Sequence, residues 1–400
     1  MVSKKIKAAM AGSSAIRAMF MEGKEMAARV GAENVYDFSL GNPASPAPKS
    51  FNEAVKAILD ETNPLVIHGY MANSGYEDVR KAIAENLNSR FGTHFDVHNI
   101  TMTVGAAGGL NIIFKTILDP EDEVIVFAPY FGEYKSYVSN YDARITEVSP
   151  DKTTFMPDLA DFERKITNKT KAVIVNTPNN PTGVVYREET LQGIARILLK
   201  KEKEFATDIY LISDEPYREL VYDGMQEMFL TKYYHNTLVG YSFSKSLSLP
   251  GERIGYVVVP DEAGDAAELT EGISVANRIL GFVNAPSLMQ KAAARCINEK
   301  TNIDFYDRNR IDLYEGLTKL GFTCVKPQGA FYLWMKSPVE DETSFVEAAK
   351  KYHIIMVKGS AFGCGGYVRL AYCVSHDTVM HSLTAFAKLA EEYNLTPRIS

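Results

Sequence analysis

The sequence contains no long uninterrupted apolar segment and no block of lysine and arginine. No stretch of about 18 apolar residues occurs, so no segment is expected to span a membrane. Charged residues soon interrupt the short apolar stretch near the N-terminus, which argues against a secretory signal and favours an amphipathic helix. The net charge of −7, without a basic block, argues against nucleic acid as a partner.

Cysteine is also scarce, and its spacing excludes the usual metal and disulfide patterns. The four cysteines form no CxxC pair, and no histidine lies at ligand spacing from any of them. We expect scattered reduced thiols in a cytoplasmic protein, and no metal site. The four are Cys296, Cys324, Cys364 and Cys373.

What the sequence does contain is an alternation of short apolar segments with helical patterns. Most of the short segments are apolar throughout, as parallel strands buried on both faces are. One of the helical stretches between them, Glu188–Phe205, carries apolar residues at helical spacing. This alternation predicts an α/β fold with a large, doubly wound, mostly parallel sheet. The expected strands are residues 123–128, 172–176, 209–213, 237–241 and 253–259.

From about Asn302 the pattern changes to α+β, which indicates a second, smaller domain. We expect three parts: an N-terminal segment of residues 1–48 that packs with the small domain, a large domain of residues 49–300, and a C-terminal small domain of residues 301–400. The expected elements of the small domain are a helix over 304–320, a strand over 330–335, a helix over 343–351, strands over 354–357 and 367–373, and a helix over 376–393.

One segment, residues 242–256, gathers groups suited to a phosphate and a reactive amine. Lys245 stands at the end of an expected strand, Ser242 and Ser244 precede it, and Arg253 leads the next expected strand. Hydroxyl donors and a planar cation bind phosphate. A partly desolvated amine near positive charge is nucleophilic at neutral pH. An isolated lysine is ordinarily a solvated side chain, but this combination favours a functional site.

The segment resembles the lysine signature of class I and II pyridoxal-phosphate aminotransferases, which is Ser-x-Ser-Lys, five residues, then Gly-x-Arg-x-Gly. The resemblance extends over nearly the whole chain and is to bacterial aspartate and aromatic aminotransferases. It implies a fold-type I transferase that binds pyridoxal 5′-phosphate. By this resemblance Lys245 carries the cofactor as a Schiff base, and Ser242, Ser244 and Arg253 help to bind it.

Further motifs supply groups for the cofactor ring. Asp214 ends an expected strand, and a buried carboxylate beside the pyridine nitrogen would keep that nitrogen charged, so that the ring acts as an electron sink. By resemblance Asn180, in a loop stiffened by prolines, and Tyr217 bond the phenolic oxygen. Phe131 is expected to stack on the ring, although Tyr130 is an alternative one position away.

Two other motifs point to the cofactor phosphate. Gly105, Ala106 and Ala107 precede a helical stretch over 110–118, and a helix N-terminus attracts an anion. By resemblance these three residues bind the phosphate. Tyr70, also by resemblance, reaches the phosphate held by a neighbouring subunit, which implies a homodimer with shared active sites.

The substrate groups are expected in the small domain and at the subunit interface. Arg369 lies in a strand-like run, and its guanidinium suits a substrate α-carboxylate. By resemblance Asn180 and the backbone of Gly41 assist it, so substrate binding is expected to draw the small domain onto the site. Arg278 lies one residue from the place where some relatives put an arginine that binds a distal carboxylate from the partner subunit.

Two departures from the family pattern concern specificity and the small domain. Ala107 stands where some bacterial aspartate aminotransferases carry a lysine for the distal carboxylate. Lys358 stands where relatives usually carry proline, and the sequence assigns it no role.

The expected reaction moves an amino group from an L-amino acid, with aspartate as a candidate, to a 2-oxo acid such as 2-oxoglutarate. It follows a ping-pong course in which Lys245 moves the proton. A β-lyase, a decarboxylase or a cyclopropane-forming synthase on the same fold would show nearly the same motifs. A cofactor-binding regulator is less favoured, because the chain has no basic segment for a DNA-binding module.

Overall fold

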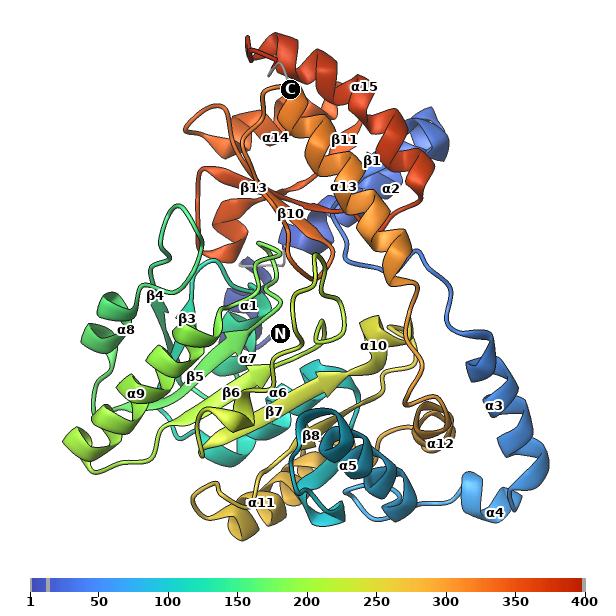
Figure 1. The fold of residues 1–400 in the computed structure, drawn as a ribbon, viewed down its shortest axis with the longest axis vertical. Helices are drawn as coiled ribbons and strands as arrows, with labels where there is room; N and C mark the ends of the chain where they lie inside the picture. The colour runs from blue at the N-terminus through green and yellow to red at the C-terminus, as the bar shows by residue number, and fades with distance from the viewer. Residues whose placement is uncertain (1, 12–14, 398–400) are drawn as a thin grey trace.

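The computed structural model describes residues 2–11 and 15–397, and its larger part is built on a seven-stranded sheet (Figure 1). The strand order is β2-β8-β7-β6-β5-β3-β4. The strands from β7 to β4 are parallel, whereas β8 is antiparallel to both β7 and β2. The predicted large, mostly parallel sheet is therefore confirmed. The strands are β2 (Ile100–Thr103), β3 (Glu123–Phe127), β4 (Arg144–Val148), β5 (Thr170–Asn176), β6 (Tyr210–Asp214), β7 (Thr237–Ser242) and β8 (Gly255–Val258).

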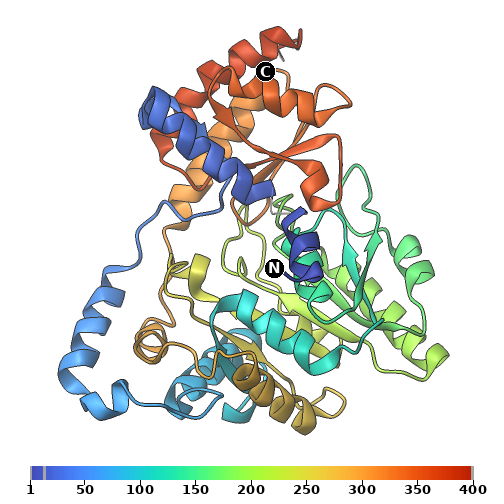
Figure 2. The same ribbon diagram turned by 180° about the vertical axis from the view of Figure 1, so that it is seen from behind.

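Both faces of this sheet are covered by helices, which explains why its strands are apolar throughout. In β3, Val124 and Val126 pack on one side, and Ile125 and Phe127 on the other. The first side is covered by α6 (Gly105–Ile117), α7 (Glu133–Ser139) and α11 (Ala266–Ile279), and α6 and α11 lie in front in Figure 2. The second side is covered by α8 (Leu159–Lys165) and α9 (Glu188–Phe205).

The β2 and β8 end of the sheet packs on a further group of helices. Their apolar residues form one buried cluster with side chains of β2, β7 and β8. The helices of the cluster are α3 (Lys49–Glu61), α4 (Pro64–Ile67), α5 (Glu77–Phe91) and α12 (Ser287–Arg295). The short elements of this part are the 3₁₀ helices η2 (Val97–Asn99) and η3 (Leu230–Lys232), and the one-turn helix α10 (Phe243–Ser246).

The smaller part, orange and red in Figure 1, contains an antiparallel sheet in the order β12-β13-β10-β9. Because β13 pairs with β10 and β12, it is an interior strand. The elements are α13 (Ile303–Lys319), β9 (Cys324–Val325), β10 (Tyr332–Lys336), α14 (Glu342–Lys350), β11 (Ile354–Ile355), β12 (Val357–Lys358), the 3₁₀ helix η4 (Gly359–Phe362), β13 (Tyr367–Ala371) and α15 (His376–Glu392).

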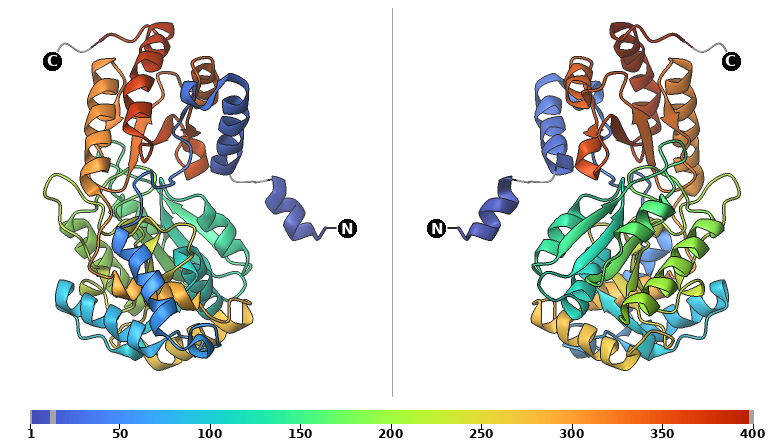
Figure 3. Two further views of the ribbon diagram at one scale, coloured as in Figure 1. Left: turned by 90° about the vertical axis from the view of Figure 1, so that its right-hand side faces the viewer. Right: turned by 90° about the vertical axis from the view of Figure 1, so that its left-hand side faces the viewer.

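The N-terminal segment contacts the small domain through α2 (Ala15–Val30), the 3₁₀ helix η1 (Ala32–Asn34) and β1 (Tyr36–Asp37). Strand β1 pairs in parallel with β11, and Met26 of α2 packs on Ile355. Helix α1 (Lys4–Ala11) projects away from the body of the chain (Figure 3). The domain boundaries at 48 and 300 stay predictions, and residues 1, 12–14 and 398–400 of the outer two parts lie outside the described residues.

Two strand expectations differ from the structure, and two strands of the large sheet were not predicted. The segment 354–357 is not one strand, because β11 and β12 belong to different sheets and Met356 lies between them. Strand β8 begins at Gly255, and Arg253 lies in the preceding turn with φ 55° rather than leading the strand. The sequence also did not predict β2 or β4.

Within the described residues, no helix is long and apolar enough to cross a membrane. The cytoplasmic location inferred from the cysteines stays a prediction.

Candidate active site

A cavity of about 260 Å³ lies at the carboxyl ends of β5, β6 and β7, where these strands meet the small domain. Ligands of open α/β sheets bind at this position. Every residue that the sequence predicted for the site lines this cavity except Tyr70, Gly105 and Arg278. The fold therefore brings together side chains from segments that are far apart in the chain.

Lys245 reaches the cavity from α10, the single helical turn that follows β7. The hydroxyl of Ser242 accepts a hydrogen bond from the backbone N–H of Ser244 and so caps this turn. The Nζ atom of Lys245 donates to the carbonyl oxygen of Gly41 at 2.5 Å. Burial lowers the pKa of Lys245 to about 8; the thiol of Cys373 opposes this shift, and nearby arginine charges add to it. A nucleophilic amine is therefore well populated near neutral pH.

Asp214 ends β6, and its side chain is buried. The hydroxyl of Tyr134 donates to its Oδ2 atom at 2.5 Å, whereas Oδ1 has no hydrogen-bond partner among the described residues. Burial raises the pKa of Asp214 to about 7, the bond from Tyr134 opposes this, and the charge of Glu215 adds to it. A buried acceptor without a donor is costly, so this oxygen suits a ligand that brings a proton or a positive charge.

Asn180 and Tyr217 reach the cavity from the loops after β5 and β6. Asn176, the last residue of β5, accepts from the backbone N–H of Asn180 at 2.7 Å and donates to the carbonyl oxygen of Asp214 at 2.9 Å. The hydroxyls of Tyr217 and Tyr332 are 2.7 Å apart. These bonds join the ends of two neighbouring strands, so the amide and phenol groups are held in defined positions.

The phosphate-binding residues expected from the sequence meet around the first turn of α6. This helix begins at Gly105, earlier than the predicted stretch over 110–118, so Ala106 and Ala107 lie in its first turn. Gly105 has φ 76°, and a Cβ atom there would lie 2.8 Å from Nη2 of Arg253. Only glycine fits between the helix start and this guanidinium, and unpaired N–H groups of the first turn favour an anion beside it.

Two serine hydroxyls lie in the same corner of the cavity. The Oγ atoms of Ser242 and Ser244 are 2.7 Å apart, and Nη1 of Arg253 donates to the carbonyl oxygen of Pro250 at 2.8 Å. Hydroxyls, helix N–H groups and a guanidinium together make a site that suits a phosphate.

Arg369 is the buried cation on the small-domain side. It lies in the interior strand β13 and is 1% exposed. Its Nη1 atom donates to Oδ1 of Asn180 at 3.0 Å and its Nη2 atom to the carbonyl oxygen of Ser39, while Nε has no partner among the described residues. Burial lowers its pKa from the ordinary value. A carboxylate ligand would satisfy the remaining donor capacity.

The contact between Gly41 and the small domain leaves no room for a side chain. A Cβ atom at this position would lie 2.1 Å from the hydroxyl of Tyr332. The Tyr332 ring in turn lies 4.5 Å from the guanidinium of Arg369. Glycine is therefore required where the N-terminal segment passes between Lys245 and the arginine.

Three predicted residues do not line the cavity of their own chain, and of these Gly105 lies beside Arg253 at the start of α6. Tyr70 is 94% exposed in the loop between α4 and α5, and Arg278 is exposed on α11. The structure places Tyr130 and Phe131 differently. The Tyr130 hydroxyl donates to Glu147 at 2.7 Å away from the cavity, and Phe131 lines it.

Sequence reasoning missed several residues of the site. Asn176 carried a usable signal, because it ends a parallel strand and faces the same edge as Asp214. Tyr134 lies one helical turn after Phe131, but nothing in the sequence indicated its bond to Asp214. Ile16 and Tyr332 come from segments with no recognised motif.

Lys358, the departure with no assigned role, has φ −65° and ψ 144°. This φ is the value that proline would impose, so a proline would fit the backbone at this position. Its side chain is not among those that line the cavity.

Comparison with known proteins identifies the family. The family model for aminotransferase class I and II matches residues 33–386. The chain belongs to this family. It is 33% identical over 356 residues to the aspartate/prephenate aminotransferase of Thermus thermophilus, which covers 88% of this chain and 90% of the relative. An aromatic-amino-acid aminotransferase of Thermococcus litoralis is 27% identical and covers 91% of this chain and 94% of the relative.

Solved structures agree with this assignment. An aminotransferase from Eubacterium rectale superposes with a TM-score of 0.95 at 48% identity and covers 98% of this chain and 100% of that one. The aspartate aminotransferase of Thermus thermophilus with maleate gives a TM-score of 0.87 at 29% identity and covers 97% and 99%. The chain is thus a fold-type I aminotransferase, and the regulator considered as an alternative is not supported.

Enzymes of this family use pyridoxal phosphate, and the cavity fits that cofactor. The free Oδ1 atom of Asp214 matches a protonated ring nitrogen, and the partly neutral amine of Lys245 matches an aldehyde. The first turn of α6 beside Arg253 matches the phosphate. Among the described residues no group of His, Cys, Asp and Glu side chains is placed to hold a metal ion.

The lowered pKa of Lys245 can be tested in the apoprotein. Because burial disfavours the charged amine, carbamylation of Lys245 by cyanate should reach half of its maximal rate near pH 8. Peptide mass spectrometry at a series of pH values measures this for each lysine. Lys200 serves as the internal control, because its ion pair with Glu163 raises its pKa above the ordinary 10.5. A midpoint for Lys245 at or above 10.5 would contradict the burial argument.

Proposed function

We propose that this aminotransferase moves the amino group of an L-amino acid, aspartate among them, to a 2-oxo acid such as 2-oxoglutarate by a ping-pong course. The observation that carries the proposal is the cavity itself. It contains a buried amine, a buried carboxyl group and a buried guanidinium, and each of these groups can still bind a ligand. The printed names of the relatives, aspartate/prephenate and aspartate aminotransferase, support aspartate as the donor.

Lys245 has two roles in this proposal. When bound, pyridoxal phosphate supplies a ring that withdraws electrons from the substrate carbon next to the bound nitrogen. Lys245 would hold the cofactor through its Nζ atom. With a substrate bound, the same Nζ atom would accept and return the proton at the substrate Cα. Burial, which lowers the pKa of this amine to about 8 in the cofactor-free protein, favours its neutral, proton-accepting form.

The groups around Lys245 orient the reactants. Asp214 would keep the ring nitrogen protonated through its free oxygen, and the Tyr134 hydroxyl holds the carboxylate in place. Asn180 and Tyr217 would bind the phenolic oxygen, and Phe131 would pack against the ring. These three side chains line the cavity.

Substrate binding uses the small-domain side of the cavity. Arg369 binds the α-carboxylate, which replaces its present contacts with Asn180 and the Ser39 carbonyl or adds to them. Gly41 lies beside it and lets the N-terminal segment approach closely. Ser242, Ser244, Arg253 and the first turn of α6 hold the phosphate.

We also propose that the active form is a homodimer in which Tyr70 and Arg278 complete the site of the partner. Large apolar side chains are exposed near both residues, including Leu65 of α4 at 85% and Ile279 of α11 at 57%. Apolar surface of this kind favours an interface. A Tyr70 hydroxyl that reaches a phosphate in the partner accounts for a side chain that is solvated in its own chain.

Replacement of Lys245 tests the central assignment. Lys245→Ala should lower kcat with aspartate and 2-oxoglutarate by at least about 10³-fold, because both the covalent anchor and the base are lost. Borohydride reduction followed by peptide mass spectrometry should find the cofactor on Lys245 in the wild-type protein and on no lysine in the variant. Lys56→Ala, an exposed lysine on α3, is the control and should behave as wild type. Turnover by Lys245→Ala would refute the assignment.

Hybrid dimers test the shared site. Tyr70→Ala alone should weaken cofactor binding about tenfold, because a phosphate contact is lost. If Tyr70 acts across the interface, a hybrid of one Tyr70→Ala subunit with one Lys245→Ala subunit contains one intact site, and that site binds the cofactor with wild-type affinity. The cofactor concentration that gives half-maximal activity is measured after purification of hybrids that carry two different affinity tags. A hybrid that needs as much cofactor as the Tyr70→Ala protein would show that Tyr70 acts within its own subunit.

The dicarboxylate hypothesis depends on Arg278. Arg278→Leu should raise the KM for aspartate by about tenfold or more, because a bidentate contact with the distal carboxylate is lost. The KM for alanine, which has no distal carboxylate, should stay the same. Steady-state kinetics with both donors and 2-oxoglutarate measure the two constants. Arg295→Leu, an exposed arginine on α12, is the matched control. Equal KM changes for both donors would exclude Arg278 as the reader of that carboxylate.

A further inference from the structure

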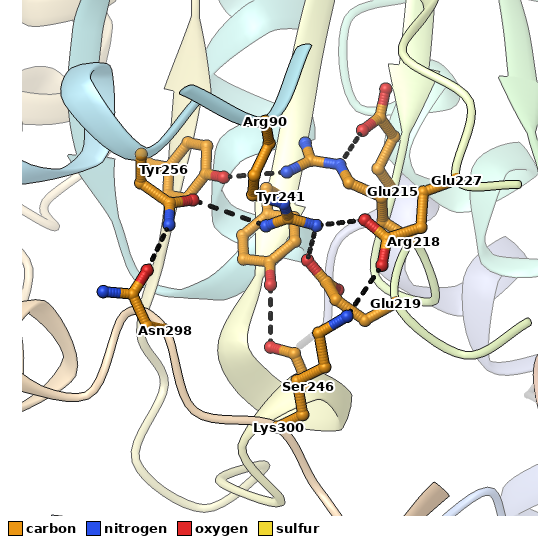
Figure 4. A network of polar contacts seen from close by, with 11 residues as sticks. Arg90, Glu215, Arg218, Glu219, Glu227, Tyr241, Ser246, Tyr256, Asn298 and Lys300 are labelled. Carbon is orange, nitrogen blue, oxygen red and sulfur yellow. Dashed lines mark hydrogen bonds and ion pairs between the residues drawn. The ribbon is translucent and has the colours of Figure 1, made fainter. Parts of the chain in front are cut away.

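Figure 4 shows a second group of polar side chains, and four of its residues are chain neighbours of residues that line the cavity. In each of four places, one residue lines the cavity and the adjacent residue belongs to this network. The pairs are Asp214 and Glu215, Tyr217 and Arg218, Ser242 and Tyr241, and Lys245 and Ser246. The backbone that presents the cavity groups is therefore held from behind by the network.

Arg218 is at the centre of this network and is 1% exposed. Its Nε atom donates to Oε2 of Glu215 at 2.5 Å, and Nη1 donates to the hydroxyl of Tyr256 at 3.1 Å. Its guanidinium lies 4.5 Å from the ring centre of Tyr241 and 5.0 Å from that of Phe229. One cation thus contacts the residue that follows β6, the second-last residue of β7 and the second residue of β8.

The network continues from Arg218 to the helix that carries Lys245. The ring of Tyr241 stacks on that of Tyr256, with centres 4.6 Å apart and planes at 24°. The Tyr241 hydroxyl donates to Oγ of Ser246 at 2.7 Å. Ser246 directly follows Lys245 in α10, and its carbonyl oxygen accepts from the backbone N–H of Thr301 at 2.7 Å. These two bonds tie this four-residue helix to β7 and to the segment before α13.

Stability alone does not account for such a network. Burying an ion pair such as Glu215–Arg218 is often no better for stability than an apolar pair of the same size. Two atoms of the network, Nη2 of Arg218 and Oε2 of Glu219, also have no partner among the described residues, which costs further stability. The charged groups are better explained by a role in holding other residues in position than by packing.

We propose that Arg218 is a positioning residue for the cofactor site. It acts through Tyr241 and Ser246 on the helix that carries Lys245. It acts through Glu215 on the end of β6. The role rests on the proposed function, since it concerns where the cofactor-binding groups lie.

The decisive variant removes the link to α10 and little else. Tyr241→Phe keeps the ring and loses the hydroxyl that meets Ser246. Tyr234→Phe is the matched control, because Tyr234 is also buried and its hydroxyl donates to the carbonyl oxygen of Ile209 at 2.6 Å. That bond lies at the opposite end of β6 from the cavity.

Three measurements separate positioning from general stability: the melting temperature of the apoprotein, the dissociation constant of pyridoxal phosphate, and the pH midpoint of Lys245 carbamylation. Both phenylalanine variants should lower the melting temperature to a similar degree. Only Tyr241→Phe should raise the dissociation constant by about fivefold or more. Only this variant should shift the carbamylation midpoint of Lys245, by about 0.5 pH unit or more in either direction.

A second variant removes the charges together, so that no lone carboxylate is left buried. Glu215→Gln combined with Arg218→Met should keep the melting temperature of the apoprotein and still weaken cofactor binding by about tenfold. If this protein does not fold, Tyr241→Phe decides alone.

The proposal is wrong if Tyr241→Phe leaves both the dissociation constant and the Lys245 midpoint at their wild-type values. It is also wrong if Tyr234→Phe changes them as much. Failure of the wild-type protein to attach the cofactor to Lys245 would instead refute the proposed function. Borohydride reduction of the wild-type protein detects that outcome before any variant is compared.

Discussion

Burial of ionisable groups without full partners is the constraint on which the rest of the site depends. Asp214 keeps one carboxylate oxygen free, Arg369 keeps one donor free, and the Lys245 amine is pushed toward its neutral form. Contact with water would pair the free atoms and remove the pKa shifts. The groups therefore keep their unpaired atoms and shifted pKa values only where two domains enclose them. The parallel sheet supplies one wall of the enclosure, and the interior strand β13 supplies the other. The cofactor and the substrate would supply the partners that the protein itself does not provide for these groups.

The sequence was most informative where a residue ends a parallel strand. Asp214 and Lys245 follow apolar segments, and such strands end at one edge of the sheet, so their proximity could be predicted without a structure. Family resemblance then assigned their roles. Tyr134 and Tyr332 could not be found in this way, because each reaches the site from a helix or a strand of another part of the chain. Their positions depend on tertiary packing alone.

The same distinction applies to the fold. The central strands were predicted because both of their faces are buried, whereas β4 is an edge strand whose residues Arg144–Val148 are mostly polar and only partly buried, so they form no apolar run. The apolar run that contains β11 and β12 looked continuous, but Met356 lies where the chain passes from one sheet to another. Arg253 was placed in a strand because apolar residues follow it, yet its positive φ belongs to a turn. Local pattern does not record which sheet a strand joins.

The network around Arg218 shows that the cavity residues are also held by side chains that do not line the cavity. Since side chains of a strand alternate in direction, each cavity residue has a neighbour on the other face. Tyr241 and Ser242 show this in β7, and Glu215 follows Asp214 in the same way. A sheet that binds a ligand at its edge therefore has a reverse side that can be adjusted without touching the ligand.

The pairing of β1 with β11 has a consequence for how the protein is made. Ser39 and Gly41 are synthesised before their partners Arg369 and Lys245, from which they are separated by 330 and 204 positions. Contacts of such long range form late and slowly. Strand β1 therefore has no partner until β11 has been synthesised. The contacts that close the catalytic pocket can form only after Arg369 has left the ribosome.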